Sequence, residues 1–202
     1  MSAEKTHANF LMYTKFDLTR KYDRMNLEEL RNEIAFKQKK GLPFICASVV
    51  IWLLIFIVTV LDLPQYEENL FVFCCSCPLL PISWIIGKAL KVDIFDKSNP
   101  LGNVGFLFTC NQFLYLLIVM WAFSAVPDKM VMIYAMVFGA HLLPYSWLYM
   151  SVSYRIFSIL IPILSLGVGC MFSALSVAGT LLLIETVFVI VLFIEVRKFN
   201  SK

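Results

Sequence analysis

Residues 42–61 read LPFICASVVIWLLIFIVTVL and contain no charged side chain. As an α-helix this stretch would be about 30 Å long, which is the thickness of the hydrocarbon layer of a bilayer. It follows a long charged segment, it exceeds the length of a signal-peptide core, and it lacks a small-residue cleavage site. These features predict a membrane-spanning helix rather than a signal peptide.

The rest of the chain repeats this pattern. Of the 202 residues, 60% are apolar and 15% are charged, against about 45–50% and about 25% in soluble domains. The apolar runs predict an all-α, polytopic integral membrane protein with six transmembrane helices. A cytoplasmic segment of residues 1–41 would precede the transmembrane domain, 42–196, and a tail of residues 197–202 would follow it. The predicted spans are 42–61, 70–90, 104–124, 130–150, 156–172 and 176–196.

The distribution of Lys and Arg predicts the orientation. Sixteen of these residues lie in the N-terminal segment, in the second-to-third and fourth-to-fifth connections, and in the tail, whereas the opposite side carries only Lys129. Positively charged loops stay in the cytoplasm. We therefore expect both termini in the cytoplasm. Because topology accounts for the positive charge, we expect the lipid bilayer as a partner and no nucleic acid.

The N-terminal segment has two parts. Residues 1–25 show no firm pattern. Asn26 can cap a helix, and Glu28 and Glu29 suit the positive end of its dipole. Apolar residues such as Ile34 then recur on one face. This short helix could lie on the cytoplasmic leaflet, or it could be a simple cytoplasmic lead-in to the first span, which is the favoured interpretation.

A shift of 63 positions aligns two parts of the chain without gaps. WLLI at 52–55 falls on YLLI at 115–118, and LLPISW at 79–84 falls on LLPYSW at 142–147. Spans one and two and spans three and four are therefore interpreted as duplicated hairpins in the same orientation, with spans five and six as a third parallel hairpin. Repeats of this kind are common in transporters, with sites at the repeat interface. Chance similarity remains the alternative.

Glu185 and His141 are the most informative polar residues. Glu185 lies near the middle of the sixth span, where a charge costs about 2.5–3.5 kcal/mol or more and usually has a partner or a proton. His141 lies at almost the same depth in the fourth span, so we expect the two side chains to form a pair that binds protons or cations. Alternatively, each side chain only makes hydrogen bonds that hold helices together.

A second polar group enters the third span. Asn111, Gln112 and Tyr115 lie close together, and Asn111 and Tyr115 share a helix face because they are four residues apart. They are candidates for contacting a substrate in a polar cavity. Hydrogen bonding between helices is the alternative and the favoured one.

Prolines are expected to break three spans. Pro78 and Pro81 lie within the second span, Pro144 within the fourth and Pro162 within the fifth, and proline removes a helical hydrogen bond. Freed backbone groups are tolerated where protein or a water-filled cavity covers them, which suits a permeation path. Because proline is also frequent in membrane helices generally, these breaks support transport without specifying it.

The cysteines give a weaker signal. Cys74 and Cys77 have the C-x-x-C spacing of redox sites, but the predicted outer loops contain no second cysteine pair. Small apolar fillers are the favoured interpretation, and a membrane thiol oxidoreductase is an alternative. No metal-ligand spacing, phosphate loop or nucleophile elbow is present. The sequence therefore predicts no catalytic residue, no metal and no cofactor, and it gives no positive reason to expect an enzyme.

Several short stretches are similar to a known family. They are NPL at 99–101, LFTCNQ at 107–112, VPDKM at 126–130 and FGAHLLP at 138–144. They resemble an uncharacterised family of bacterial multi-pass membrane proteins, mostly from Gram-positive species, from about Met25 to the end of the fifth span. The resemblance implies a bacterial plasma membrane and brings no site residues.

Together these patterns favour translocation of a small solute or ion, coupled to protons, with Glu185 as the proton carrier and His141 as its partner. The rival hypothesis is a membrane protein that does not transport: a sensor, an assembly factor or an immunity-type partner. The substrate is an unknown small solute or ion, and the sequence leaves a homo-oligomer open.

Overall fold

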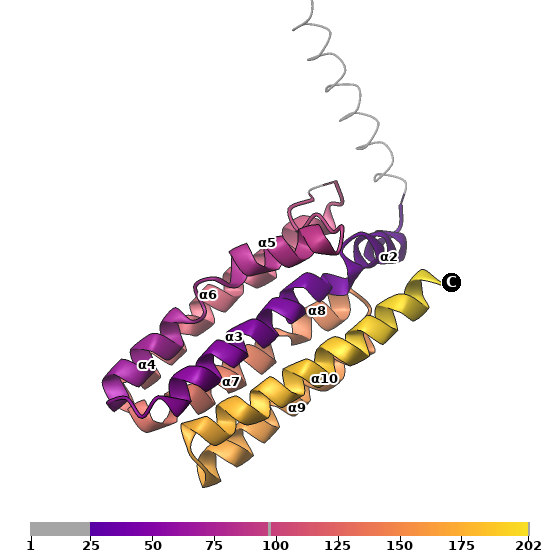
Figure 1. Ribbon diagram of the computed structural model, residues 1–202. Coiled ribbons are helices and arrows are strands. Elements are labelled where there is room, and N and C mark those ends of the chain that lie inside the picture. Colours follow the sequence, from indigo (N-terminus) through magenta and orange to yellow (C-terminus); the bar gives the residue numbers. More distant parts are fainter. Residues whose placement is uncertain (1–24, 97, 202) are drawn as a thin grey trace, which may run out of the picture.

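The computed structural model describes residues 25–96 and 98–201, and within them the secondary structure is helical throughout (Figure 1). Six helical segments of this part are long and apolar enough to cross a membrane, which confirms the predicted fold class. Their bounds are Lys39–Val60, Gln65–Ala89, Leu101–Ala125, Pro127–Leu148, Val152–Met171 and Ala174–Phe199.

The second and the fourth of these spans are each built from two α-helices with a break between them. The short helix α2 precedes the spans. The elements are α2 (Leu27–Lys37), η1 (Lys39–Gly41), α3 (Leu42–Val60), α4 (Gln65–Cys74), α5 (Leu79–Ala89), α6 (Leu101–Ala125), η2 (Pro127–Lys129), α7 (Met130–His141), α8 (Leu143–Leu148), α9 (Val152–Met171) and α10 (Ala174–Asn200).

The second span begins five residues before the predicted position. Pro64 precedes the first turn of α4, and Glu67 and Glu68 lie in that turn. Acidic side chains near a helix N-terminus interact favourably with its dipole, and proline is compatible with a helix start. The helix therefore extends beyond the apolar run from which the span was predicted.

Four helices form the centre of the bundle. α10 packs along α3, α9 packs along α7, and α9 and α10 form a hairpin that joins the two pairs (Figure 1). α5 packs on the outside of α3, and α6 packs on the outside of α7. The second and third spans are consequently the least buried, and their exposed apolar side chains suit contact with lipid.

The helix breaks follow the repeat in the sequence. α4 ends at Cys74 and α5 begins at Leu79, while α7 ends at His141 and α8 begins at Leu143. Leu79 corresponds to residue 142 in the 63-residue shift, so both breaks occur at equivalent places. Pro81 and Pro144 lie in the first turns of α5 and α8, where a missing N–H costs no helical hydrogen bond.

Pro162 does not break its helix, although the sequence predicted a break there. It lies inside α9, which continues without interruption from Val152 to Met171. Its ring packs against Gly139 of α7, which has no side chain to obstruct it. A close neighbouring helix can cover the backbone that proline leaves free, so the predicted break in the fifth span is wrong.

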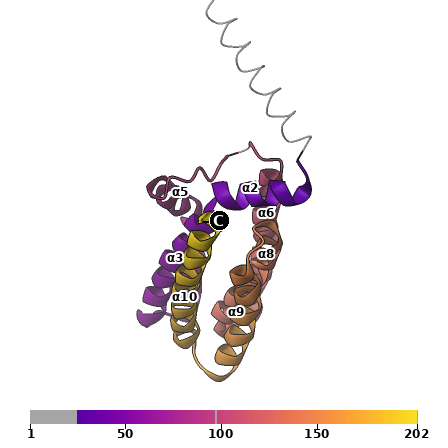
Figure 2. The same cartoon turned by 90° about the vertical axis from the view of Figure 1, so that its right-hand side faces the viewer.

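α2 lies across one end of the bundle, the same end as the C-terminus (Figure 2). A capping box starts it: the Asn26 side chain accepts from the Glu29 N–H at 2.9 Å, and the Glu29 carboxylate accepts from the Asn26 N–H at 3.1 Å. Arg31 donates to the carbonyl of Trp147 on α8 and lies 4.7 Å from the centre of its ring. We call this end of the bundle the α2 end.

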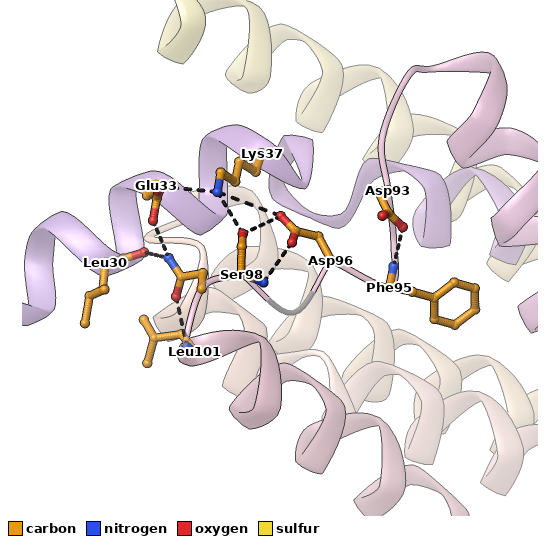
Figure 3. A network of polar contacts seen from close by, with 9 residues as sticks. Leu30, Glu33, Lys37, Asp93, Phe95, Asp96, Ser98 and Leu101 are labelled. Atoms are coloured by element: carbon orange, nitrogen blue, oxygen red, sulfur yellow. Dashed lines mark hydrogen bonds and ion pairs between the residues drawn. The ribbon is translucent and has the colours of Figure 1, made fainter. Parts of the chain in front are cut away.

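A polar network joins α2 to the loop before α6 (Figure 3). Lys37 donates to the Ser98 hydroxyl at 2.8 Å and lies 3.8 Å from the Asp96 carboxylate. Asn99 donates to the carbonyl of Leu30 at 2.9 Å. α2 is therefore an integrated part of the folded domain, which neither interpretation of the N-terminal segment foresaw.

The connection between α2 and α3 is a left-handed turn. Lys39, Lys40 and Gly41 have φ angles of 45°, 52° and 70°. Such angles cost energy for residues with a side chain, and here both lysines are held by other elements. Lys39 donates to the carbonyl of Leu90 after α5 at 2.7 Å, and Lys40 donates to Glu195 of α10 at 2.7 Å.

A substitution at Gly139 tests the contact between α7 and α9. An added Cβ would lie 2.5 Å from Cδ of Pro162 and 2.6 Å from Cγ2 of Ile161. We expect Gly139→Ala to lower the free energy of unfolding by about 1–3 kcal/mol, as overpacking does in tight cores, when thermal unfolding is measured in detergent. The matched control is Gly167→Ala, where no atom lies within 4 Å of the new Cβ. Equal stability of the two variants would contradict this packing.

Asp96 makes the network at α2 dependent on pH. Burial alone would raise the pKa of Asp96, but hydrogen bonds from Ser98 and the charge of Lys37 hold that pKa below its usual value. A carboxyl whose pKa is depressed by folding stabilises the fold above its unfolded pKa, and this stabilisation is lost as the pH falls through the folded pKa.

We therefore expect Asp96→Asn to lower stability at neutral pH by about 1 kcal/mol, which is typical of a partly exposed ion pair. The difference from the wild type should vanish in acid, below the folded pKa. Thermal unfolding in detergent across a pH series measures both. Asp128→Asn, whose side chain is 68% exposed, is the control and should have little effect at any pH. A difference that persists unchanged in acid would refute the assignment.

Candidate functional site

Glu185 lies on the buried face of α10, near the middle of the sixth span. Leu181, Phe188 and Leu192 share that face, and all four side chains have 0% exposure. The spacing of three and four residues places them in one stripe along the helix. Glu185 thus occupies a buried position of a kind that is normally filled by an apolar residue such as leucine.

Within the described residues, the carboxyl group of Glu185 is hydrogen-bonded to one side chain, that of Ser48. Its Oε2 atom lies 2.5 Å from the hydroxyl of Ser48, which is on α3 and also near the middle of its span. The Ser48 hydroxyl lies 2.8 Å from the carbonyl oxygen of Ile45 as well. The other carboxyl oxygen of Glu185, Oε1, is buried and has no hydrogen-bond partner in the described part of the chain.

The predicted pair of Glu185 and His141 does not form. His141 lies at the end of α7, where its Nδ1 atom contacts the backbone carbonyl of Phe138 in the preceding turn. Across the described residues, no hydrogen bond or ion pair joins the imidazole to the carboxyl group. His141 obtains its contact within its own helix, and Glu185 obtains its contact from α3.

A series of ring contacts lies between the two predicted partners. The His141 ring packs against Tyr145 with 6.2 Å between centroids, and Tyr145 packs against Tyr154 at 6.1 Å. Tyr154 packs edge-on against Phe188 at 5.1 Å, one turn after Glu185 on α10. Aromatic pairs of this kind stabilise by about 0.5–1.5 kcal/mol each. The rings of α8, α9 and α10 thus connect the regions of His141 and Glu185 by apolar contact.

The polar residues of the third span lie elsewhere. Asn111, Gln112 and Tyr115 are on α6, are partly exposed, and make no side-chain hydrogen bond within the described residues. α6 packs against α7 and α8, whereas Glu185 faces α3. One neighbour links α6 to the His141 region, because Thr109 lies 2.9 Å from the hydroxyl of Tyr145. The structure therefore brings α6 near His141 and away from Glu185.

A second acidic site on α10 contrasts with the first. One oxygen of Glu195 accepts from Lys40 at 2.7 Å. The other accepts from the hydroxyls of Ser151 and Ser153 and from the Ser153 N–H at 3.2 Å, at the start of α9. Both oxygens are satisfied, as a carboxylate at a helix N-terminus beside a cation should be. This site joins η1, the start of α9 and α10, and its geometry is that of a structural anchor.

Sequence reasoning missed Ser48 and the Glu195 site for different reasons. Ser48 is a small residue within an apolar run, and only its depth, equal to that of Glu185, could have indicated it. Lys40 and Glu195 lie near span ends, where charges are expected from topology alone. Neither the residue types nor the sequence spacing of Lys40 and Glu195 indicates that they pair. Only the structure shows that the two side chains are in contact.

The cysteines provide no metal site. All six are free thiols, with Cys74 and Cys77 exposed beside the break between α4 and α5. Among the described residues, no group of three or more His, Cys, Asp or Glu side chains could hold a metal ion. An open hollow at the end opposite α2 is lined by Gln65, Tyr66, Phe123, Ser124 and Pro127, and it does not include Glu185.

Comparisons with known proteins identify a family without assigning an activity. No curated protein and no solved structure matches the chain. The model of one protein family matches residues 27–195, which include α2, all of α3 to α9 and most of α10. The matched region includes Ser48, His141 and Glu185. The chain therefore belongs to DUF7010, a family of unknown function.

Proposed function

We propose that this chain is a plasma-membrane carrier of a small solute or ion, with transport coupled to protonation and deprotonation of Glu185. The α2 end faces the cytoplasm in this proposal. The observation that supports it is the state of the Glu185 carboxyl group: it is fully buried near the middle of a span, and one of its oxygens has no partner in the described structure.

The energetics of burial favour a functional role for Glu185. An ionisable group at the centre of a bilayer costs at least about 2.5–3.5 kcal/mol when charged. A buried polar atom without a partner costs about 1–3 kcal/mol even when it is neutral. An apolar residue would pack the α3–α10 contact without either cost. Glu185 therefore weakens the packing of the bundle, and a proton-binding role accounts for its position.

The polar residues near His141 are the proposed solute contacts. Asn111, Gln112 and Tyr115 are partly exposed on α6, and their side-chain donors and acceptors are not used within the described residues. Pro144 lies in the first turn of α8, directly after the break that follows His141, and it has no N–H to donate across that break. Discontinuous helices with free backbone groups are a recurrent feature of transporter sites. In this proposal, solute binding near α6 and α8 is coupled to Glu185 through the intervening rings.

A second function, that of a membrane sensor or assembly partner without transport, is favoured by the tight packing around the site. Ala135, Ser165, Ala178 and Leu181 are all fully buried, so the centre of the bundle is closed in this conformation. Under this hypothesis Ser48 and Glu185 only hold α3 and α10 together. The two functions predict different effects of one substitution.

Glu185→Gln preserves the size and hydrogen-bonding capacity of the side chain but cannot release a proton. The protein is reconstituted in liposomes that contain a pH-sensitive dye. Sodium, potassium, alanine or glucose is added outside in turn, and the internal pH is followed. We expect at least one of these probes to drive proton flux with the wild type, and Glu185→Gln to reduce that flux at least tenfold with unchanged folded yield.

Glu67→Gln, at an exposed position in the first turn of α4, is the matched control and should retain the flux. Flux that survives Glu185→Gln, or wild-type liposomes that respond to none of the four probes, would contradict the proposal. A change in thermal stability alone would support the non-transporting function.

A further inference from the structure

The hydroxyl group of Ser48 contacts two oxygen atoms at once. Its Oγ lies 2.5 Å from Oε2 of Glu185 and 2.8 Å from the carbonyl oxygen of Ile45. A serine hydroxyl has one hydrogen and two lone pairs. It can therefore donate to only one of these oxygens, and the other contact requires a hydrogen from a different atom.

The two protonation states of Glu185 differ in whether this requirement is met. If Glu185 were ionised, both neighbours of Ser48 would be pure acceptors, and one short oxygen–oxygen contact would have no hydrogen. If Oε2 is protonated, it donates to Ser48, and Ser48 donates to Ile45. Each of the two short oxygen–oxygen contacts then contains one hydrogen atom. Of the two protonation states of Glu185, only the neutral one provides a hydrogen for both contacts.

The surroundings of the carboxyl group agree with this count. On α9, the ring of Tyr154 packs against Phe188, one turn after Glu185, and a phenol cannot carry a positive charge. In η1, before α3, Lys40 is bound to Glu195, and at the end of α7, His141 contacts the carbonyl of Phe138. None of the helices packed against α10 presents a cation to Glu185 within the described structure.

We infer that Glu185 holds a proton on Oε2, which it donates as a hydrogen bond to Ser48 while Ser48 donates to the carbonyl of Ile45, so the ion that this site takes is a proton. The geometry of Ser48 alone carries the protonation. That this proton is the coupling ion rests on the proposed function.

A metal cation fits the same site poorly. Hard cations such as calcium take six to eight oxygen ligands, whereas the contacts of this site supply the two carboxyl oxygens, one hydroxyl and one carbonyl that already accepts from Ser48. The oxygen Oε1 is buried and has no hydrogen-bond partner among the described residues, and Leu181 and Phe188 on the adjacent turns of α10 are fully buried apolar side chains. A proton needs only one oxygen atom, and it neutralises the carboxylate without further ligands.

Infrared spectroscopy of the full chain in liposomes tests the protonation directly. At neutral pH, we expect the wild type to show the C=O stretching band of a carboxylic acid, shifted in heavy water, and Glu185→Gln to lack it. Ser48→Ala should retain the band but move it to higher frequency, because the acid loses its acceptor. Ser48→Thr, which keeps the hydroxyl, should leave the band close to its wild-type position.

Glu195→Gln is the control for the other acid of α10. Glu195 is hydrogen-bonded as a carboxylate by Lys40 and the α9 serines, so its substitution should change only carboxylate bands. If Glu185→Gln removes a carboxylate band and no acid band, Glu185 is ionised and the inference is wrong. Should Glu185→Gln not fold, an acid band that is unmoved by Ser48→Ala would overturn the inference in the same way.

The infrared result is independent of the transport assay. If the acid band depends on Glu185 but the protein shows no flux, the proton site is supported and the carrier function is refuted. Flux that depends on Glu185 without an acid band would retain the carrier and refute the protonated ground state.

Discussion

The fold depends on the contact between its first and last spans. α3 and α10 pack along their length, and the bond between Ser48 and Glu185 at the middle joins residues 137 positions apart. α9 then packs on α10, and α7 packs on α9. The arrangement of the central helices therefore depends on α10, which is the last span in the chain. Apolar side chains provide most of this contact, and Glu185, the one fully buried acid among the described residues, interrupts them near the middle of the last span.

The two acids of α10 illustrate how environment assigns a role to one residue type. Glu195 and Glu185 lie ten residues apart on the same helix. Glu195 has a lysine, two hydroxyl groups and a backbone N–H around it, which stabilise its charge. Glu185 has one hydroxyl and apolar neighbours, which favour its neutral form. The first can serve as a fixed anchor, whereas the second can change its charge only when the packing around it opens.

The position of a residue along its helical span was predictable, whereas the side of the helix on which it lies was not. Residue counting within apolar runs located six membrane-competent spans and placed Glu185 near the middle of the last one, because helix rise is constant. The pairing with His141 failed because it required knowing which helices are neighbours and how each is rotated. Long apolar spans such as α3 and α6 are apolar on all sides, so periodicity does not identify their buried face. Ser48, the partner that does form, differs from many small residues in membrane helices only by what it faces.

The position of α2 has a mechanical consequence for the buried carboxyl group. α2 is fixed to α8 through Arg31 and, through the left-handed turn that follows it, to α10 through Lys40 and Glu195. α10 is an unbroken helix from Ala174 to Asn200, so a displacement of one part of α10 also moves the rest of the helix. Glu185 lies about 15 Å from Glu195 along the axis of α10. A force applied to α2 from outside the bundle would therefore be transmitted along α10 to Glu185, whose Oε1 atom has no hydrogen bond within the described part of the chain.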